Sequence, residues 1–298
     1  MKMNIPRGVV NAILTPFKSD GRIDISLLEK QTLFLMNGGL DGLFVNGSTG
    51  EGLLLTIEEK CETLSCIKEI TKGAVDLYAC CIRPTTHQVI KDLERMQILG
   101  PDYVVAVPPL YYPGDQDMIY IHFKEIAAAS SIPLVLYNFP QMTNNPLHLE
   151  TLIKLAELEN IIGVKDSSGD FLSFVQGTES HSSDEFCWMQ GDDLLHASSL
   201  LAGSASVVTG LGNVSIEDHV ALYKAFLQKD YETMWFHQKE LNRLYRIITE
   251  TGKGVPAIKA ATAILGRSTF PMKDSWLNLT KAEIKKIASI LLEIGINQ

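Results

Sequence analysis

Short apolar segments alternate with longer amphipathic segments along most of this chain, and this alternation restricts the folds that are open to it. The short segments are rich in β-branched and aromatic residues, as expected for strands that are buried on both faces. Eight such segments occur, and we predict strands at Val9–Leu14, Gly42–Asn46, Leu77–Cys81, Tyr103–Val107, Leu134–Tyr137, Ile161–Lys165, Phe186–Gln190 and Ser204–Thr209.

The segments between the predicted strands have the apolar spacing of helices that pack on a core. One of them opens with Thr56 and carries Glu59 three residues later, which is the pattern of a capping box. Eight successive strand–helix units are typical of a closed parallel barrel with its helices outside, so we predict an α/β fold, a (β/α)8 TIM barrel. The helices are predicted at Ile25–Asn37, Thr56–Ile70, Thr85–Leu99, Asp117–Ser130, Leu147–Leu158, Phe171–Glu179, Leu194–Ala202 and Ile216–Gln228.

The last part of the chain contains no segment with the character of a strand. Helices are expected instead at Tyr231–Thr249, Val255–Leu265 and Thr280–Ile294. No linker rich in Gly, Ser or Pro separates these helices from the barrel. We therefore predict a catalytic barrel over residues 1–228 and a C-terminal helical extension over residues 229–298 that packs on it.

Charge and composition argue against several kinds of partner. The chain of 298 residues has a formal net charge of -9 and no cluster of Lys or Arg, which argues against binding to nucleic acid or to an anionic membrane. No apolar stretch reaches the roughly 18 to 20 residues that span a bilayer. The N-terminus lacks the pattern of a secretory signal, so we expect a cytoplasmic protein. The cysteines show no CxxC spacing and are expected to be reduced packing residues.

The motifs of metal and cofactor binding are missing from the sequence. The histidines form no HxH or HExxH pattern, and there is neither a GxGxxG dinucleotide loop nor a P-loop. We therefore predict no metal and no cofactor.

In parallel barrels of this kind the active site lies at the C-terminal ends of the strands. The sixth predicted strand ends in a lysine, Lys165, which is unusual within an apolar strand because burying an ammonium group is costly. Burial favours the neutral amine, and this form of lysine attacks a carbonyl group to make an imine. The alternative is a lysine paired with Asp166 or Asp170.

Two other strand ends carry groups that suit the same chemistry. After the second strand, Ser48 and Thr49 lie in a glycine-rich turn whose N–H and hydroxyl groups can hold a carboxylate or phosphate, unless it is an ordinary turn. Glu51 in this turn is expected to be structural rather than a general base. The fifth strand ends in Tyr137, which is either a proton relay or a core aromatic residue.

The other strand ends are less specific. Tyr111 and Tyr112 follow the fourth strand in a proline-rich loop and could reach a site or form a subunit contact. Polar residues after the seventh and eighth strands could bind substrate hydroxyls or cap turns, and among them are Asp193 and Asn213.

Taken together, these segments resemble the family of dihydrodipicolinate synthase and N-acetylneuraminate lyase. The resemblance extends over most of the chain, from about Gly8 to Gly266, and also includes Thr15-Pro16-Phe17 after the first strand. The matching motifs keep the family's order and spacing, and they are Gly47-Ser48-Thr49-Gly50-Glu51, Tyr137-Asn138-Phe139-Pro140 and Gly163-Val164-Lys165-Asp166.

The resemblance implies a metal-free, lysine-dependent aldolase or lyase that acts on pyruvate. Lys165 would attack the ketone of pyruvate, and the protonated imine would withdraw electrons from adjacent C–C bonds. Tyr137 would move protons to and from the carbinolamine and the aldehyde oxygen. Tyr111 would support this relay, because it aligns with a tyrosine of the family that often does so across a dimer interface.

The same resemblance implies how pyruvate is held and how the protein assembles. Ser48 and Thr49 would bind the pyruvate carboxylate, and Val208 would lie beside pyruvate through its backbone carbonyl. The partners are then small molecules, namely pyruvate and either an aldehyde or a 2-keto-3-deoxy acid. A homotetramer built as a dimer of dimers is expected from the family.

The second substrate depends on residues that vary within the family. Synthases of the lysine pathway usually have an arginine two residues after the proline of the tyrosine motif, which binds the carboxylate of aspartate semialdehyde. Met142 takes that place here and cannot pair with a carboxylate. The sialic-acid lyase typically has an acidic residue and a serine where this chain has Leu194 and Gly210.

The motifs more closely resemble aldolases of 2-keto-3-deoxy sugar acids such as 2-keto-3-deoxygluconate. Ser167 and Asp193 would then bind hydroxyls of the acceptor, although Asn144 replaces a glycine that is common in this region. We therefore predict an aldolase that reversibly cleaves such an acid into pyruvate and an aldehyde. The alternatives are a dihydrodipicolinate synthase, an N-acetylneuraminate lyase and a catalytically silent protein that binds 2-oxo acids.

Overall fold

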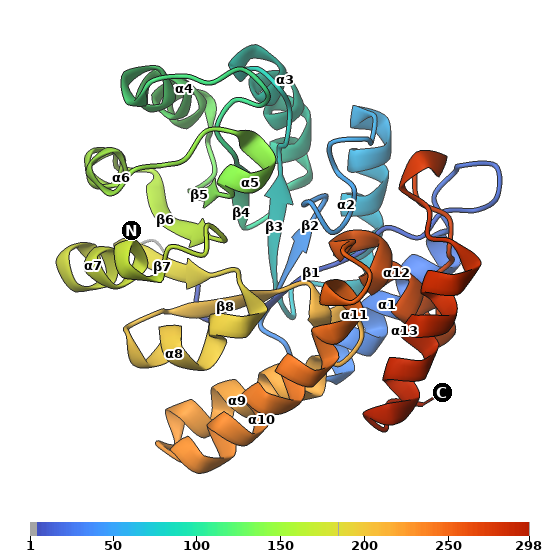
Figure 1. Cartoon of the computed structure of the whole chain (residues 1–298). Helices are drawn as coiled ribbons and strands as arrows, with labels where there is room; N and C mark the ends of the chain where they lie inside the picture. The colour runs from blue at the N-terminus through green and yellow to red at the C-terminus, as the bar shows by residue number, and fades with distance from the viewer. Residues whose placement is uncertain (1–4, 184, 298) are drawn as a thin grey trace.

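The fold is a closed barrel of eight parallel strands surrounded by helices, as predicted (Figure 1). The computed structural model describes residues 5–183 and 185–297. The ring closes where the first strand pairs with the eighth, with Val10 opposite Val208. The strands are β1 (Gly8–Ala12), β2 (Gly42–Val45), β3 (Asp76–Cys80), β4 (Tyr103–Ala106), β5 (Leu134–Asn138), β6 (Ile161–Asp166), β7 (Cys187–Gln190) and β8 (Ser206–Thr209).

Side chains alternate between the inside and the outside of the barrel because successive residues of a strand point to opposite faces. One set fills the interior and includes Phe44, Tyr78, Tyr137 and Val208. The set of opposite parity packs against the surrounding helices. In the pairing of β5 with β6, Tyr137 lies opposite Lys165, so these two predicted site residues are neighbours across the sheet.

The predicted helices of the barrel are present in the predicted order, with shorter bounds in several places, and the short helix α5 is an addition that the sequence did not predict. The capping box of Thr56 and Glu59 is present at the start of α2. The segment predicted at Leu194–Ala202 begins instead with a short 3-10 turn, because the Asp192 side chain accepts a hydrogen bond from the backbone N–H of Leu194. The helices are α1 (Ile25–Asn37), α2 (Ile57–Thr71), α3 (Thr86–Met96), α4 (Gln116–Ala129), α5 (Pro140–Thr143), α6 (Leu149–Ala156), α7 (Phe171–His181), α8 (His196–Leu201) and α9 (Ile216–Leu227).

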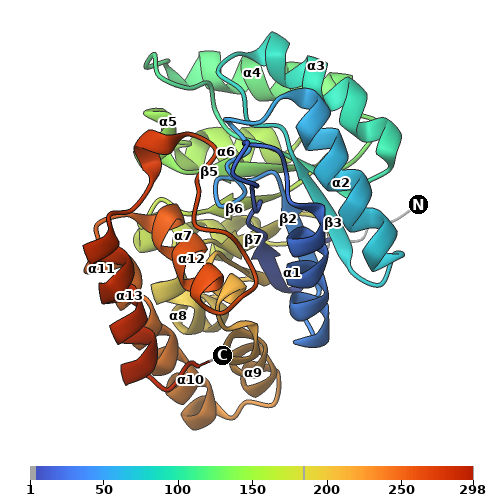
Figure 2. The ribbon, with the colours of Figure 1, turned by 90° about the vertical axis from the view of Figure 1, so that its right-hand side faces the viewer.

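The remaining helices lie against one side of the barrel (Figure 2). They are α10 (Tyr231–Leu244), α11 (Arg246–Thr249), α12 (Gly254–Ile264) and α13 (Lys281–Glu293). The predicted helix Tyr231–Thr249 is divided at Tyr245, the residue between α10 and α11. A separate apolar cluster joins α12 and α13 to the turn after β8, where Leu211 and Val214 are buried. Among the described residues no helix is both long enough and apolar enough to cross a bilayer.

Asn213 joins the first and last strands of the ring at their C-terminal ends. Its side-chain amide donates 2.8 Å hydrogen bonds to the carbonyl oxygens of Ala12 and Gly210. Its backbone carbonyl accepts a 2.8 Å bond from Arg267, which follows α12. Asn213 therefore holds the loops after β1 and β8 by its side chain, and it contacts the C-terminal part of the chain by its backbone carbonyl.

We expect Asn213→Ala to lower the free energy of unfolding by about 2 to 4 kcal/mol, since buried backbone groups lose their partners. The exposed Asn37 at the end of α1 offers a matched control. Asn37→Ala should change stability by less than about 0.5 kcal/mol. Urea denaturation of both variants checks the difference, and equal values would contradict this role of Asn213.

Candidate active site

Lys165 lies inside the C-terminal end of the barrel and faces aromatic rings. Its Nζ is 3.9 Å from the centroid of the Tyr137 ring and 5.1 Å from that of Phe44. The residue is only 6% exposed. The two rings come from β5 and β2, so the barrel brings together side chains that are far apart in the sequence.

Lys165 is one of three buried lysines among the described residues, and the other two have acidic partners. Lys60 Nζ lies 2.7 Å from Asp92, and Lys259 Nζ lies 2.6 Å from Glu51. No ion pair is formed by Lys165 within the described part of the chain. Lys165 therefore differs from Lys60 and Lys259, whose ammonium groups form ion pairs with carboxylates.

The ion pair considered for Lys165 from the sequence is replaced by other contacts. Asp166 points to the opposite side of β6, where its carboxylate accepts hydrogen bonds from Asn138 at 2.8 Å and from the Ser168 hydroxyl at 2.9 Å. Burial raises the pKa of Asp166 to about 6. Asp170 accepts hydrogen bonds from Ser173 at the start of α7. Both carboxylates are therefore engaged away from the amine of Lys165.

Ser167 lies close to the Lys165 side chain, at the point where Gly191 approaches it. A Cβ placed on Gly191 would lie 2.2 Å from the Ser167 hydroxyl oxygen and 2.8 Å from Cε of Lys165. The Ser167 hydroxyl is buried and has no hydrogen-bond partner among the described residues. Buried hydroxyls normally have a partner, so a ligand beside Lys165 is a natural acceptor or donor for this one.

The glycine-rich turn after β2, which carries Ser48 and Thr49, places Thr49 near the end of β8. Thr15 donates a 2.8 Å hydrogen bond to the carbonyl oxygen of Gly50 and so ties this turn to the segment after β1. Thr49 is adjacent to Gly210, since a Cβ placed on this glycine would lie 3.3 Å from the Thr49 hydroxyl. Val208, two residues before Gly210, is buried in the barrel interior.

The side chains of Tyr111 and Met142 face solvent in the single chain, with exposed fractions of 78% and 67%. Tyr111 has a left-handed backbone with φ +81°, and its carbonyl oxygen accepts a 3.3 Å hydrogen bond from the Asn144 side chain. Asn144 is itself left-handed at φ +63°, where it ends α5. Asparagine tolerates this conformation, which explains how it can replace a glycine there.

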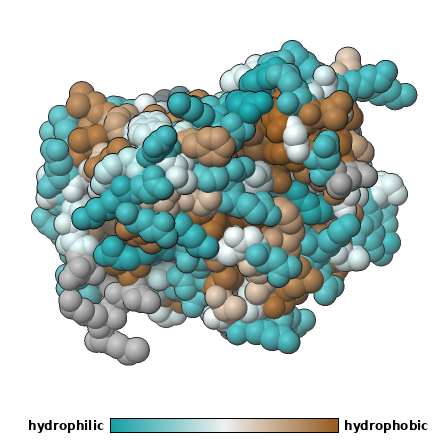
Figure 3. All heavy atoms as spheres, turned by 90° about the horizontal axis from the view of Figure 1, so that it is seen from below, coloured by the Kyte–Doolittle hydropathy of each residue, from teal (hydrophilic) through white to brown (hydrophobic). Residues whose placement is uncertain are grey.

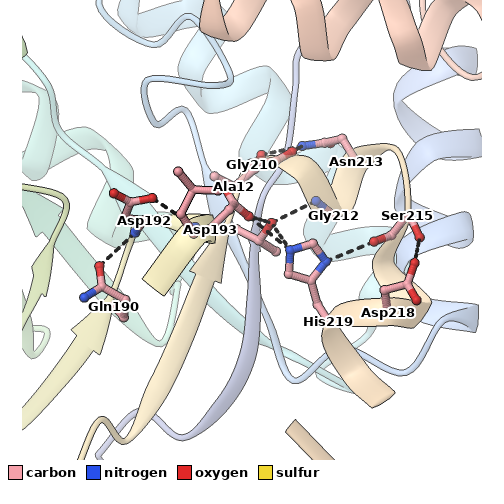
Figure 4. A network of polar contacts seen from close by, with 12 residues as sticks. Ala12, Gln190, Asp192, Asp193, Gly210, Gly212, Asn213, Ser215, Asp218 and His219 are labelled. Carbon is pink, nitrogen blue, oxygen red and sulfur yellow. Dashed lines mark hydrogen bonds and ion pairs between the residues drawn. The ribbon is translucent and has the colours of Figure 1, made fainter. Parts of the chain in front are cut away.

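Asp193 belongs to a buried polar network between β8 and α9 (Figure 4). Its Oδ1 accepts a hydrogen bond from Thr209 at 2.5 Å and lies 3.0 Å from Nε2 of His219. His219 Nδ1 donates to the Ser215 carbonyl at 3.0 Å. Burial acts to raise the pKa of Asp193, but the contacts with His219 and Thr209 outweigh it and leave this pKa below its usual value.

His196 adjoins this network, and burial lowers its pKa to about 3. Asp193, His196 and His219 each offer one ligand atom, and these atoms lie within 4.8 Å of one another, so this is where the described residues could hold a metal ion. Sequence reasoning missed both histidines because they lie on helices behind the strands. The only signal was Asp193, which stood out in the turn after β7.

The comparisons with known proteins agree with this geometry. A family model described as the dihydrodipicolinate synthetase family matches residues 5–294. The 4-hydroxy-tetrahydrodipicolinate synthase of Moorella thermoacetica is 32% identical over 291 residues, which cover 97% of this chain and 98% of that protein. A DapA-like lyase of Thermococcus onnurineus is 31% identical over 296 residues, with 97% and 99% of the two chains covered.

The chain belongs to the dihydrodipicolinate synthetase family. Among solved structures, the dihydrodipicolinate synthase of Aquifex aeolicus has a TM-score of 0.92 at 25% identity and covers 98% of this chain and 99% of its own. The chloride-inhibited synthase of Acinetobacter baumannii, solved with pyruvate, has a TM-score of 0.91 at 25% identity, with 97% and 99% covered. As a family member, the chain is a pyruvate lyase of the Schiff-base type, which confirms the predicted enzyme class.

Gly191 tests the packing around Lys165. We expect Gly191→Ala to slow the exchange of pyruvate methyl protons with D2O by about tenfold or more, because the new methyl group displaces Lys165 and Ser167 from their places. This exchange needs only the pyruvate half of the reaction and can be followed by NMR. Gly254→Ala, at a position with open space, is the matched control and should keep the normal rate. A normal rate for Gly191→Ala would show that the site tolerates the methyl group.

Proposed function

We propose that the protein is a class I aldolase that reversibly cleaves a 2-keto-3-deoxy sugar acid into pyruvate and an aldehyde. The observation that carries this choice is the buried hydroxyl of Ser167 beside Lys165, which has no hydrogen-bond partner among the described residues. A hydroxylated substrate would give this group a hydrogen bond. The exposed Met142, in place of an ionic partner, supplies nothing for a second carboxylate.

In this proposal Lys165 is the imine-forming residue. Its neutral amine attacks the ketone carbon of the substrate, and loss of water leaves a protonated imine. Tyr137 removes the proton of the C4 hydroxyl as the C3–C4 bond breaks, and the bonding electrons move into an enamine. Protonation of the enamine and hydrolysis then release pyruvate and restore the lysine. The position of the Tyr137 ring 3.9 Å from Nζ supports this pairing.

The other predicted residues have supporting roles in the same proposal. Ser48 and Thr49 bind the carboxylate of pyruvate, and the Val208 carbonyl lies beside it. Ser167 and Asp193 bind hydroxyls of the acceptor, where Asp193 would use Oδ2, since Oδ1 is engaged with Thr209. The solvent-facing Tyr111 would complete the proton relay of a neighbouring subunit.

Assembly into a homotetramer remains part of the proposal. Exposed aromatic side chains support it, because an isolated surface gains little from displaying large rings. Tyr111 and Tyr112 are 78% and 77% exposed, and α10 displays Trp235 and Phe236. The face seen from below in Figure 3 shows hydrophobic patches between hydrophilic residues.

The second candidate is a 4-hydroxy-tetrahydrodipicolinate synthase. Similarity to the synthase of Moorella thermoacetica favours it, since that protein matches nearly the whole chain at 32% identity. Condensation would use the same imine but would require a group that binds the carboxylate of aspartate semialdehyde. For an N-acetylneuraminate lyase the acid replaced by Leu194 is missing, and a silent binding protein has no need for both Lys165 and Tyr137.

A substrate panel distinguishes these candidates. We expect cleavage of 2-keto-3-deoxygluconate or a related acid, and condensation of pyruvate with glyceraldehyde, at rates well above those with aspartate semialdehyde. Pyruvate release coupled to lactate dehydrogenase measures cleavage. Turnover with aspartate semialdehyde and none with sugar acids or glyceraldehyde would contradict the proposed substrate.

Ser167→Ala tests how the acceptor is recognised. We expect kcat/KM for the sugar acid to fall by about 10- to 100-fold, which corresponds to one lost hydrogen bond in a buried site. Trapping of pyruvate as an imine should be nearly unchanged. An equal loss in both measurements would place Ser167 in the pyruvate half of the site instead.

Tyr137→Phe tests the proton relay. We expect slow imine formation to persist, while kcat falls by about 100-fold or more because no general acid–base group remains. Borohydride trapping and steady-state turnover on the same preparation separate the two effects. Turnover equal to the wild type would rule out this role for Tyr137.

A further inference from the structure

Glu51 has an unusual backbone in the turn that carries Ser48 and Thr49. Its φ is +57°, in the left-handed region that a glutamate adopts at a cost. The turn folds back on itself, because the N–H of Glu51 donates to the Ser48 carbonyl and the N–H of Gly52 donates to the Gly47 carbonyl, each at 3.0 Å. Contacts from outside the turn add to these two hydrogen bonds.

The carboxylate of Glu51 is buried and bonded on both oxygens by the C-terminal part of the chain. Oε1 accepts a 2.6 Å hydrogen bond from Nζ of Lys259, and both side chains are almost wholly buried. Oε2 accepts a 2.7 Å hydrogen bond from the backbone N–H of Lys273. Residues more than 200 positions away thus hold the turn by a single side chain.

Lys259 lies on α12 and also contacts the segment after β1. Its Nζ lies 4.0 Å from the centroid of the Phe17 ring, in the segment after β1. The preceding residue, Ile258, approaches Gly210, as Thr49 does. A Cβ placed on this glycine would lie 3.2 Å from Ile258 and 3.3 Å from the Thr49 hydroxyl. Helix α12 therefore meets the turn both at Glu51 and next to Thr49.

We propose that Lys259 is a positioning residue for pyruvate binding. The ion pair between Lys259 and Glu51 fixes the turn so that Ser48 and Thr49 can bind the pyruvate carboxylate. The inference rests on the proposed function of Ser48 and Thr49. It gives the C-terminal helices a part in substrate binding. Lys259 does not touch pyruvate; it acts through Glu51.

A role in positioning accounts for the pair better than a role in stability. Taking two charges out of water is costly, and a buried ion pair is often no more stabilising than apolar residues of the same size. Its specific effect is to hold one geometry. The backbone of Glu51 and the hydrogen bond from Lys273 show that a particular geometry is held here.

Lys259→Met is the direct test, read out as the pyruvate concentration that gives half-maximal borohydride trapping on Lys165. We expect this concentration to rise by about 10-fold or more, as expected when hydrogen bonds to a charged group are misplaced, with the maximal extent of trapping preserved. The matched control is Lys60→Met. Lys60 is also buried and paired, and its ammonium group contacts Asp92 and the Ile82 carbonyl rather than the turn. Its one hydrogen bond to Asn46, next to the turn, is accepted by its backbone carbonyl, which the substitution keeps. Asp92 would still have its 2.7 Å bond to Arg83.

A second variant distinguishes weaker pyruvate binding from loss of folding. Lys259→Met alone leaves the carboxylate of Glu51 buried without its ammonium partner, whereas Glu51→Gln combined with Lys259→Met removes both charges. The double variant should be more stable than the single one and still bind pyruvate weakly. Half-saturation equal to the wild type in the double variant, or a rise of the same size in Lys60→Met, would overturn the proposal.

The pH dependence of half-saturation by pyruvate gives a second test, because a purely structural role of Lys259 would not change it. Burial lowers the pKa of Lys259 to about 8, against the opposing effect of Glu51. The other charged groups here are Lys273, whose Nζ lies 5.3 Å from the Phe17 ring, and Glu59, which pairs with Lys273. As the pH rises through 8, Lys259 loses its proton, so half-saturation by pyruvate should rise in the wild type.

In Lys259→Arg the guanidinium stays charged, and this rise should move to higher pH. The same pH profile in Lys259→Arg and the wild type would contradict the role of Lys259. If the wild type forms no adduct on Lys165 at all, the proposed function fails. If the wild type forms the adduct and Lys259→Met reaches half-maximal trapping at the same pyruvate concentration, only the positioning role of Lys259 fails.

Discussion

Closure of the eight-stranded ring is the constraint on which the rest of the structure depends. Because the strands are parallel and paired around the whole circle, each residue has a fixed side, and one residue of slippage would exchange inside for outside. In β6 this alternation turns Lys165 toward the rings of Tyr137 and Phe44 and turns Asp166 toward Asn138 and Ser168. The barrel thereby buries an amine and keeps the nearest carboxylate on the other face. The other two buried lysines of the described residues, Lys60 and Lys259, are paired with carboxylates, whereas Lys165 has no such partner among them.

The same closure explains which features could be predicted from the sequence. The strand containing Lys165 was visible as an apolar β-branched run, and the ordered motifs at Ser48, Tyr137 and Lys165 indicated the family and the strand ends that form the site. Local hydrogen bonding was also readable, as in the capping box of Thr56 and Glu59. These features depend on neighbours in the sequence or on the regular period of the strands.

Contacts between segments that are distant in the chain could not be predicted from the sequence. Glu51 was expected to be structural, but nothing near it indicated Lys259, which lies on α12 and reaches it through the packed C-terminal helices. Asp193 was expected in the acceptor site, but the sequence did not indicate the contacts of its Oδ1 with Thr209 and with His219 on α9. The side chain of Tyr111 is exposed, so its proposed role depends on a neighbouring subunit. Such pairings follow from tertiary packing, which periodicity does not encode.

The central claim is that Lys165 is the amine that forms the imine with pyruvate. Incubating the wild-type protein with pyruvate, reducing with borohydride and mapping the modified peptide by mass spectrometry tests it directly. We predict one adduct per chain, on Lys165, and none in a folded Lys165→Ala variant. An adduct on Lys60 or Lys259, or no adduct at any near-neutral pH, would contradict it.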